Sequence, residues 1–152
     1  MLSGYALKSV ARAMAHPLSL RCKTIGPRLR EQVVLRVSAV NRCAVCSAIH
    51  GVVARAEGLT KDDIRKARIA LDDEGHDERT RVALRYAELR TAEQETAFPE
   101  AVDAFERMFN EEERREIRAI VDLFTFNNRF NNTWEGVLPG ADGRRRNLEP
   151  VT

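Results

Sequence analysis

The 152-residue chain has few of the residues that break helices, with only eight glycines and five prolines. An all-β protein needs many tight turns, so this scarcity argues against that fold class. Charge of one sign is also lacking, because 25 Lys and Arg residues nearly balance 23 Asp and Glu residues. The resulting net charge of +2 gives no indication of a nucleic-acid partner or of a polybasic membrane-binding protein.

Long apolar runs are missing as well. No stretch approaches the roughly 18 uncharged apolar residues that a membrane span requires. The N-terminal segment contains Lys8 and Arg12 and lacks the continuous apolar region of a signal peptide, so we expect a cytoplasmic protein. The three cysteines, Cys22, Cys43 and Cys46, are an odd number, which argues against a structural disulfide framework. A close pair in a reducing compartment is more typical of catalysis or metal binding.

The chain does contain helical patterns in abundance. Apolar residues, 43% of the sequence, recur at intervals of three or four, and no alternating run indicates a strand. The expected helices span Tyr5 to His16, Pro27 to about Val40, Asn41 to Gly58, a short stretch from Thr60, Asp77 to Gln94, a stretch from Pro99, and Asn110 to about Trp134. Thr60, with Asp63 three residues on, has the arrangement of a capping box. We predict an all-α protein with about six to seven helices in a single domain over residues 1–152, with a peripheral tail at 138–152.

A reactive pattern, C-x-x-C-x-x-x-H, lies in the third expected helix. On a helix, Cys43, Cys46 and His50 fall within about 60° of one face, with Cys46 and His50 one turn apart. The opposite face is apolar, and we expect it to pack against the rest of the protein. Its members are Val45, Ile49, Val52 and Val53.

These residue types suit thiol chemistry. The thiolate is the nucleophile, and a free thiol with a pKa of about 8.5 is mostly protonated at neutral pH. His50 can take the proton from Cys46, while the positive end of the helix mainly favours Cys43. The two-residue gap lets the sulfurs join in a disulfide, so that oxidation of one cysteine can be resolved by the other.

Glu31 lies in the preceding helix, about 100° from a polar stripe formed by Arg28, Gln32 and Arg36. A carboxylate with apolar neighbours is generally either paired or functional. If Glu31 faces the next helix, it can orient His50 or relay its proton.

The spacing of Glu31, Cys43, Cys46 and His50, with matching flanks over residues 27–66, resembles the signature of the alkylhydroperoxidase D-like branch of the carboxymuconolactone decarboxylase family. The resemblance implies a helical fold that assembles as trimers or hexamers and reduces hydrogen peroxide or organic hydroperoxides. By position, Cys46 is the peroxidatic cysteine and Cys43 the resolving one. His50 is then the general base, and Glu31 completes a proton relay.

The sequence departs from the family pattern between the cysteines, and the chemistry that the resemblance implies requires an external reductant. Between the cysteines, Ala44 and Val45 stand where relatives carry a histidine or a tyrosine. Turnover requires an external dithiol or a protein reductant to reopen the disulfide. No nucleotide or haem motif is present, so we expect no bound cofactor, and we expect neither a nucleic-acid nor a membrane partner.

Several alternatives stay open at this point. The same cysteines suit a disulfide reductase or a redox sensor, and two thiolates, an imidazole and a carboxylate suit a zinc-binding or oligomerisation module. Four asparagines near the end of the last helix either cap it, line a subunit contact or border the active pocket; they are Asn127, Asn128, Asn131 and Asn132. The basic cluster Arg144, Arg145 and Arg146 has no assigned role.

Overall fold

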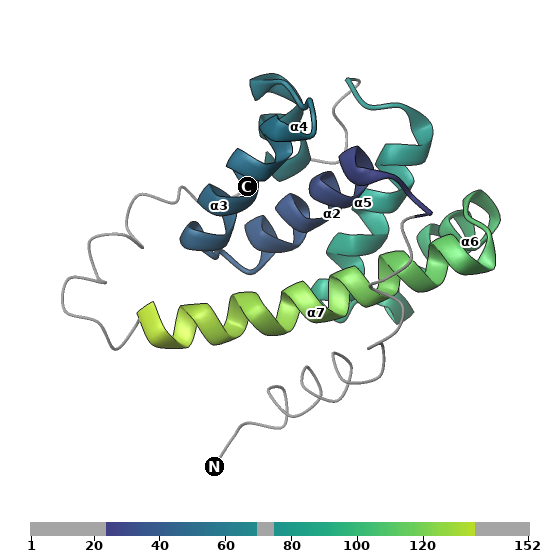
Figure 1. Ribbon diagram of the computed structural model, residues 1–152. Helices are drawn as coiled ribbons and strands as arrows, with labels where there is room; N and C mark the ends of the chain where they lie inside the picture. Colours follow the sequence, from purple (N-terminus) through teal and green to yellow (C-terminus); the bar gives the residue numbers. More distant parts are fainter. Residues whose placement is uncertain (1–23, 70–74, 136–152) are drawn as a thin grey trace, which may run out of the picture.

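The computed structural model describes residues 24–69 and 75–135, and within these ranges all regular structure is helical (Figure 1). The helices, labelled as in Figure 1, are α2 (Pro27–Val40), α3 (Ala44–Ala56), α4 (Lys61–Ile69), α5 (Glu78–Thr91), the short 3₁₀ helix η2 (Glu95–Ala97), α6 (Pro99–Met108) and α7 (Glu111–Glu135). The prediction of an all-α fold is confirmed. The expected helix at 5–16 and the tail at 138–152 lie outside the described residues. None of the described helices is long and apolar enough to cross a membrane.

Helix α2 occupies the centre of the fold and contacts α3, α4, α5 and α7 (Figure 1). Because α2 is enclosed in this way, Gln32 and Arg36 of its polar stripe are buried. Arg36 is stabilised by an ion pair of 2.7 Å with Glu88 of α5 and by donating a hydrogen bond of 2.7 Å to the carbonyl of Arg68. A buried charge is tolerated when it is paired and hydrogen-bonded in this way.

Local sequence signals mark the ends of several helices. Thr60 and Asp63 exchange hydrogen bonds of 2.8 and 3.1 Å between backbone N–H groups and side chains, the reciprocal cap predicted for α4. Asn110 and Glu113 form the same arrangement at the start of α7. Gly58 follows α3 with a φ of 84°, the left-handed conformation that favours glycine after a helix.

The core lies between α2, α5, α6 and α7. Tyr86 and Phe105 stack with ring centroids 3.7 Å apart, and Ile117 and Val121 of α7 are fully buried. Beside this core, Arg90 binds the carboxylate of Asp122 through two hydrogen bonds of 2.8 and 2.7 Å. This bidentate pair fixes the angle between α5 and α7.

Glu116 connects α7 to the segment that leads into α2. Its buried carboxylate accepts hydrogen bonds from Thr24 (backbone N–H and hydroxyl, both 2.6 Å) and from the Ile25 N–H (3.2 Å), and it pairs with Arg30. Burial alone would raise the pKa of Glu116, but these hydrogen bonds outweigh burial and hold its pKa below the ordinary value. The first residues before α2 are therefore anchored to α7.

Candidate active site

The two cysteines lie at the start of α3. The sequence predicts that this helix begins at Asn41, but Asn41 ends α2, and Cys43 is the N-cap of a helix that begins at Ala44. The sulfur of Cys43 accepts a hydrogen bond of 3.3 Å from the backbone N–H of Cys46. Cys43 therefore occupies the capping position usually taken by Ser, Thr, Asp or Asn, where unpaired N–H groups favour negative charge.

A disulfide joins Cys43 to Cys46. The two Cα atoms are 5.3 Å apart, within the ordinary range for a bridged pair. Both cysteines are buried. The expectation that this spacing brings the two sulfurs together thus agrees with the geometry, and Cys22 lies outside the described residues.

Glu31 and His50 meet across the contact between α2 and α3. His50 Nδ1 lies 2.9 Å from Glu31 Oε2, and Glu31 is buried. A carboxylate only accepts hydrogen bonds, so Nδ1 is the donor in this contact and Nε2 is left for another partner. Phe124 of α7 packs edge-to-face on the imidazole, with ring centroids 4.9 Å apart. The carboxylate and the aromatic ring together fix the orientation of His50.

Cys46 and His50 open onto a shared cavity of about 290 Å³ between α3 and α7. The cavity is lined by Cys46, Ile49, His50, Phe124, Asn127, Asn128 and Asn131. Among the contacts of the described residues, none joins the imidazole directly to the sulfur of Cys46. A small molecule in the cavity can therefore contact both groups, and a water molecule can carry a proton between them.

The asparagines near the end of α7 form one wall of this cavity and secure α7 to the rest of the site. The amide of Asn131 donates a hydrogen bond of 3.3 Å to the sulfur of Cys46. On either side, Asn128 contacts the Ser38 hydroxyl at 3.4 Å and Asn132 donates to the Asn41 carbonyl at 2.8 Å.

The sequence left three roles open for these asparagines, and the structure places Asn127, Asn128 and Asn131 at the pocket. Their spacing of one, three and four residues gathers them on one side of a helix. That spacing was the available signal, but nothing in the sequence indicated that α7 would lie beside the cysteines.

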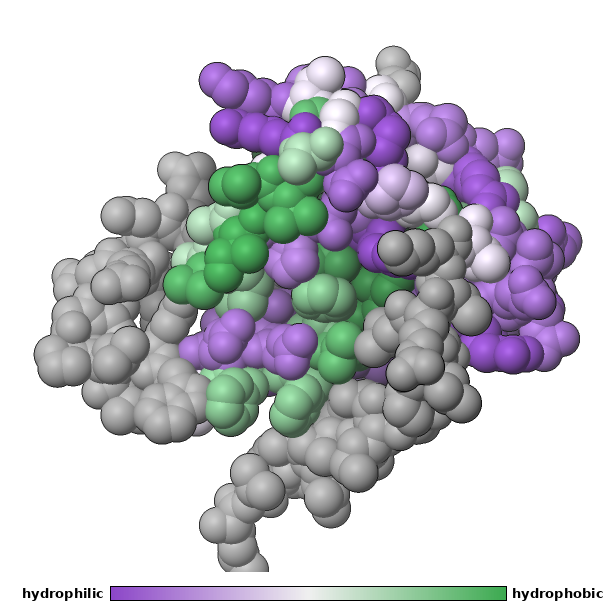
Figure 2. Space-filling view, in the orientation of Figure 1, coloured by the Kyte–Doolittle hydropathy of each residue, from purple (hydrophilic) through white to green (hydrophobic). Residues whose placement is uncertain are grey.

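The apolar side of α3 faces away from the protein. Ile49, Val52 and Val53 are 56%, 69% and 37% exposed, so the expectation that this face packs inside is wrong. Figure 2 shows the result as a green area over α3. The physical reason is that the other side of α3, which carries Cys46 and His50, is the side turned toward α2 and α7.

Next to Cys46 in the sequence, the backbone of α3 is joined to α4 by the guanidinium group of Arg68. Arg68 donates a hydrogen bond to the carbonyl of Ser47, the residue after Cys46. Burial, followed by the nearby charge of Arg55, lowers the pKa of Arg68. A Cβ at Gly51 would lie 2.9 Å from the Arg68 guanidinium, so the absence of a side chain at Gly51 leaves room for this contact.

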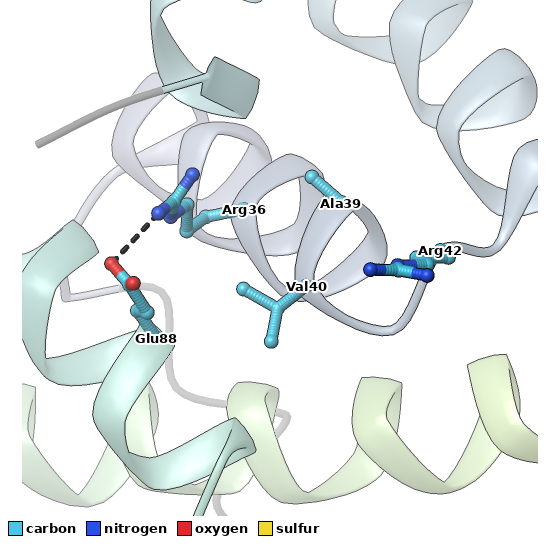
Figure 3. Close-up of a pocket in the computed structure, with 5 residues that line it drawn as sticks. All are labelled: Arg36, Ala39, Val40, Arg42 and Glu88. Atoms are coloured by element: carbon cyan, nitrogen blue, oxygen red, sulfur yellow. Dashed lines mark hydrogen bonds and ion pairs between the residues drawn. The ribbon is translucent and has the colours of Figure 1, made fainter. Parts of the chain in front are cut away.

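A second cavity, of about 180 Å³, lies on another side of α2 (Figure 3). It is lined by Arg36, Ala39, Val40, Arg42 and Glu88, and the dashed line in Figure 3 marks the ion pair of Arg36 with Glu88. This pairing neutralises the buried cation, and the lining contains neither a thiol nor an imidazole. The cavity beside Cys46 is therefore the better candidate for chemistry.

Within residues 24–69 and 75–135, no three His, Cys, Asp or Glu side chains are grouped so that they could hold a metal ion.

Comparison with protein families gives a match to the model described as the carboxymuconolactone decarboxylase family over residues 11–89, which is just over half of the chain. A comparison with curated proteins found no match.

Proposed function

The chain belongs to the carboxymuconolactone decarboxylase family, and we propose that it is a thiol-dependent peroxidase of the alkylhydroperoxidase D-like branch. Its substrates would be hydrogen peroxide or organic hydroperoxides. The observation that carries the proposal is the meeting of a Cys43–Cys46 disulfide with a hydrogen-bonded His50–Glu31 pair at one cavity.

In the first step, Cys46 is the attacking thiolate. His50 Nε2 takes the thiol proton through a water molecule, and the Glu31 carboxylate stabilises the imidazolium that results. The thiolate attacks the terminal oxygen of the hydroperoxide ROOH, a sulfur–oxygen bond forms and the oxygen–oxygen bond breaks. The sulfur is oxidised to a sulfenic acid, and the alkoxide takes the proton from His50 and leaves as ROH.

In the second step, Cys43 resolves the sulfenic acid. Its sulfur attacks the sulfur of Cys46, the thiol proton and the hydroxyl group leave together as water, and the disulfide forms. An external dithiol then returns both cysteines to thiols and is itself oxidised to a disulfide. The buried position of the pair makes access through the cavity beside Cys46 the route for that reductant.

The dimensions of the cavity favour compact substrates. Its volume of about 290 Å³ lies at the lower end of the range for sites that bind small molecules. Ile49 and Phe124 offer apolar contact to a short alkyl group, while the asparagine wall suits the polar peroxide end. A small organic hydroperoxide fits this lining better than a long-chain lipid hydroperoxide.

The test counts thiols and follows peroxide. Reduced protein is treated with one equivalent of hydrogen peroxide or tert-butyl hydroperoxide, its free thiols are counted, and peroxide consumption with excess dithiothreitol is measured. We expect the loss of two thiols and multiple turnovers, with Cys22→Ser behaving like the wild type. If the protein consumes no peroxide but reduces a disulfide substrate, the result would favour a disulfide reductase instead. Zinc found by elemental analysis at one equivalent per chain would favour the zinc-binding module.

We further propose a homo-oligomer, a trimer or a hexamer, located in the cytoplasm. The exposed apolar face of α3, with Ile49, Val52 and Val53, supports an assembly, because adjoining apolar side chains on a surface are typical of protein contacts. Light scattering tests the assembly, and a mass equal to one chain of 17.2 kDa at micromolar concentration would contradict it.

A further inference from the structure

Within residues 24–69 and 75–135, Asn131 is a polar side chain from outside α3 that contacts the sulfur of Cys46. Its amide nitrogen lies 3.3 Å from that sulfur, a distance suited to a hydrogen bond donated to sulfur. Asn131 reaches the site from α7 and lines the same cavity as His50. An amide N–H₂ is a donor that no change of pH within the physiological range can remove.

The position of Asn131 is fixed by its neighbours on α7. Asn128, three residues earlier, is fully buried and contacts Ser38 of α2. Asn132, the next residue, donates to the Asn41 carbonyl at the end of α2. These two contacts hold α7 against the α2–α3 connection, and Asn131 lies between them. The donor is therefore held in place by the fold, as a group that stabilises developing charge has to be.

The charges around Cys46 leave a need for such a donor. On α3, His50 shares the cavity with Cys46, and its imidazole is hydrogen-bonded to the carboxylate of Glu31 on α2. From α4, Arg68 donates to the Ser47 carbonyl. From α7, the cavity lining consists of Phe124 and uncharged amides. A donor aimed at the sulfur is the contact that favours the ionised thiol over the neutral one.

We propose that Asn131 is a catalytic residue that stabilises the thiolate of Cys46 by donating a hydrogen bond to its sulfur. The inference rests on the proposed function, in that it takes Cys46 as the attacking cysteine. Asn131 makes the thiolate more abundant at neutral pH, while His50 and Glu31 move the proton. The hydrogen bond is present in the disulfide form, so the donor is already in place when reduction releases the thiolate.

The test uses Cys46 alkylation, which does not depend on peroxide. In a Cys43→Ser background, the rate of iodoacetamide labelling of Cys46 is followed against pH by mass spectrometry of its peptide. Asn131→Leu keeps a similar size and removes the donor. We expect the pH midpoint of labelling to rise by about one unit, which is about a tenfold lower rate below the midpoint. Asn131→Asp should raise it further, because a carboxylate repels the thiolate. Asn127→Leu, one turn earlier in the same cavity wall, should leave the midpoint unchanged.

The outcomes separate this inference from the peroxidase proposal. A raised midpoint in Asn131→Leu, with an unchanged thermal unfolding curve, supports the role of Asn131 even if the wild type consumes no peroxide. An unchanged midpoint in Asn131→Leu and Asn131→Asp would overturn the role of Asn131 even if the wild type is an active peroxidase. Equal shifts in Asn131→Leu and Asn127→Leu would also overturn it, because they would indicate a general effect of cavity polarity.

Discussion

Glu31 and His50 are joined by a hydrogen bond of 2.9 Å between a buried carboxylate and one nitrogen of a ring that lines the cavity beside Cys46. This bond fixes which nitrogen carries the hydrogen and leaves the other free to act as a base. The pair thus connects the centre of the fold, α2, to the cavity beside Cys46.

His50→Ala should slow sulfenic acid formation at neutral pH by about 100-fold or more, because a positioned general base is lost. Glu31→Gln should slow it by roughly tenfold, since a hydrogen bond to a charged group contributes about 1.5 kcal/mol or more. If both act by removing the proton, the lost rate should return as the pH rises and solvent generates the thiolate. Stopped-flow measurement of peroxide oxidation from about pH 6 to 9 checks this. A deficit that stays constant over that range would contradict a proton relay.

Substitution of the two cysteines should give different products. Cys46→Ser should abolish sulfenic acid formation, because the sulfur facing the cavity is gone. Cys43→Ser should allow one oxidation and then accumulate sulfenic acid or more highly oxidised forms, because no resolving thiol remains. Dimedone labelling followed by mass spectrometry distinguishes them. Sulfenic acid on Cys43 of the Cys46→Ser variant, formed at the wild-type rate, would reverse the assignment.

Val52→Glu should separate the proposed oligomer. Val52 is 69% exposed in the middle of the apolar face of α3, and a carboxylate buried there in a subunit contact would be strongly unfavourable. Light scattering should then give a mass near one chain, while Lys61→Glu, an exposed change on α4, should leave the assembly intact. If Val52→Glu has the same oligomeric mass as the wild type, the subunit contact does not involve this face of α3.

Glu116→Gln should lower the free energy of unfolding at neutral pH by about 2 kcal/mol, because the buried carboxylate accepts several hydrogen bonds. The pKa of Glu116 is lowered in the folded protein, so its contribution is complete above the pKa of an unfolded glutamate, about 4.3, and is lost as the pH falls through the lower folded value. Urea unfolding at a series of pH values checks this. The difference between wild type and variant should shrink below about pH 4, and a difference independent of pH would contradict the role of the charge.

Much of the fold was predictable because its signals are local. The helix from Pro27 to Val40 has the expected bounds, and the Thr60–Asp63 cap begins α4 as predicted, since both depend on residues close in sequence. The error at Asn41 has a local cause too. Asn is suited to either end of a helix, and here the chain uses Asn41 to end α2 and Cys43 to begin α3.

The failures concern which face of a helix meets which neighbour. Periodicity showed that Cys46 and Val52 lie on different sides of α3, but it could not show that the reactive side is the one enclosed. Arg36 belongs to a polar stripe in the sequence, and its burial depends on an ion pair with Glu88 of α5, which no local pattern shows. The contact of Asn131 with Cys46 depends on the docking of a helix far along the chain, which no local pattern encodes.

Asn131 follows Cys46 by 85 positions in the sequence, and this separation has a consequence for biosynthesis. The ribosome releases the thiols, the imidazole and the carboxylate well before it makes the wall that encloses them. Until α7 docks, the nascent chain lacks the Asn131 contact with Cys46 and the α7 side of the cavity. A chain terminated before α7 would keep Cys43, Cys46, His50 and Glu31 and lack the α7 wall of the cavity, so the proposed peroxidase chemistry requires synthesis through α7.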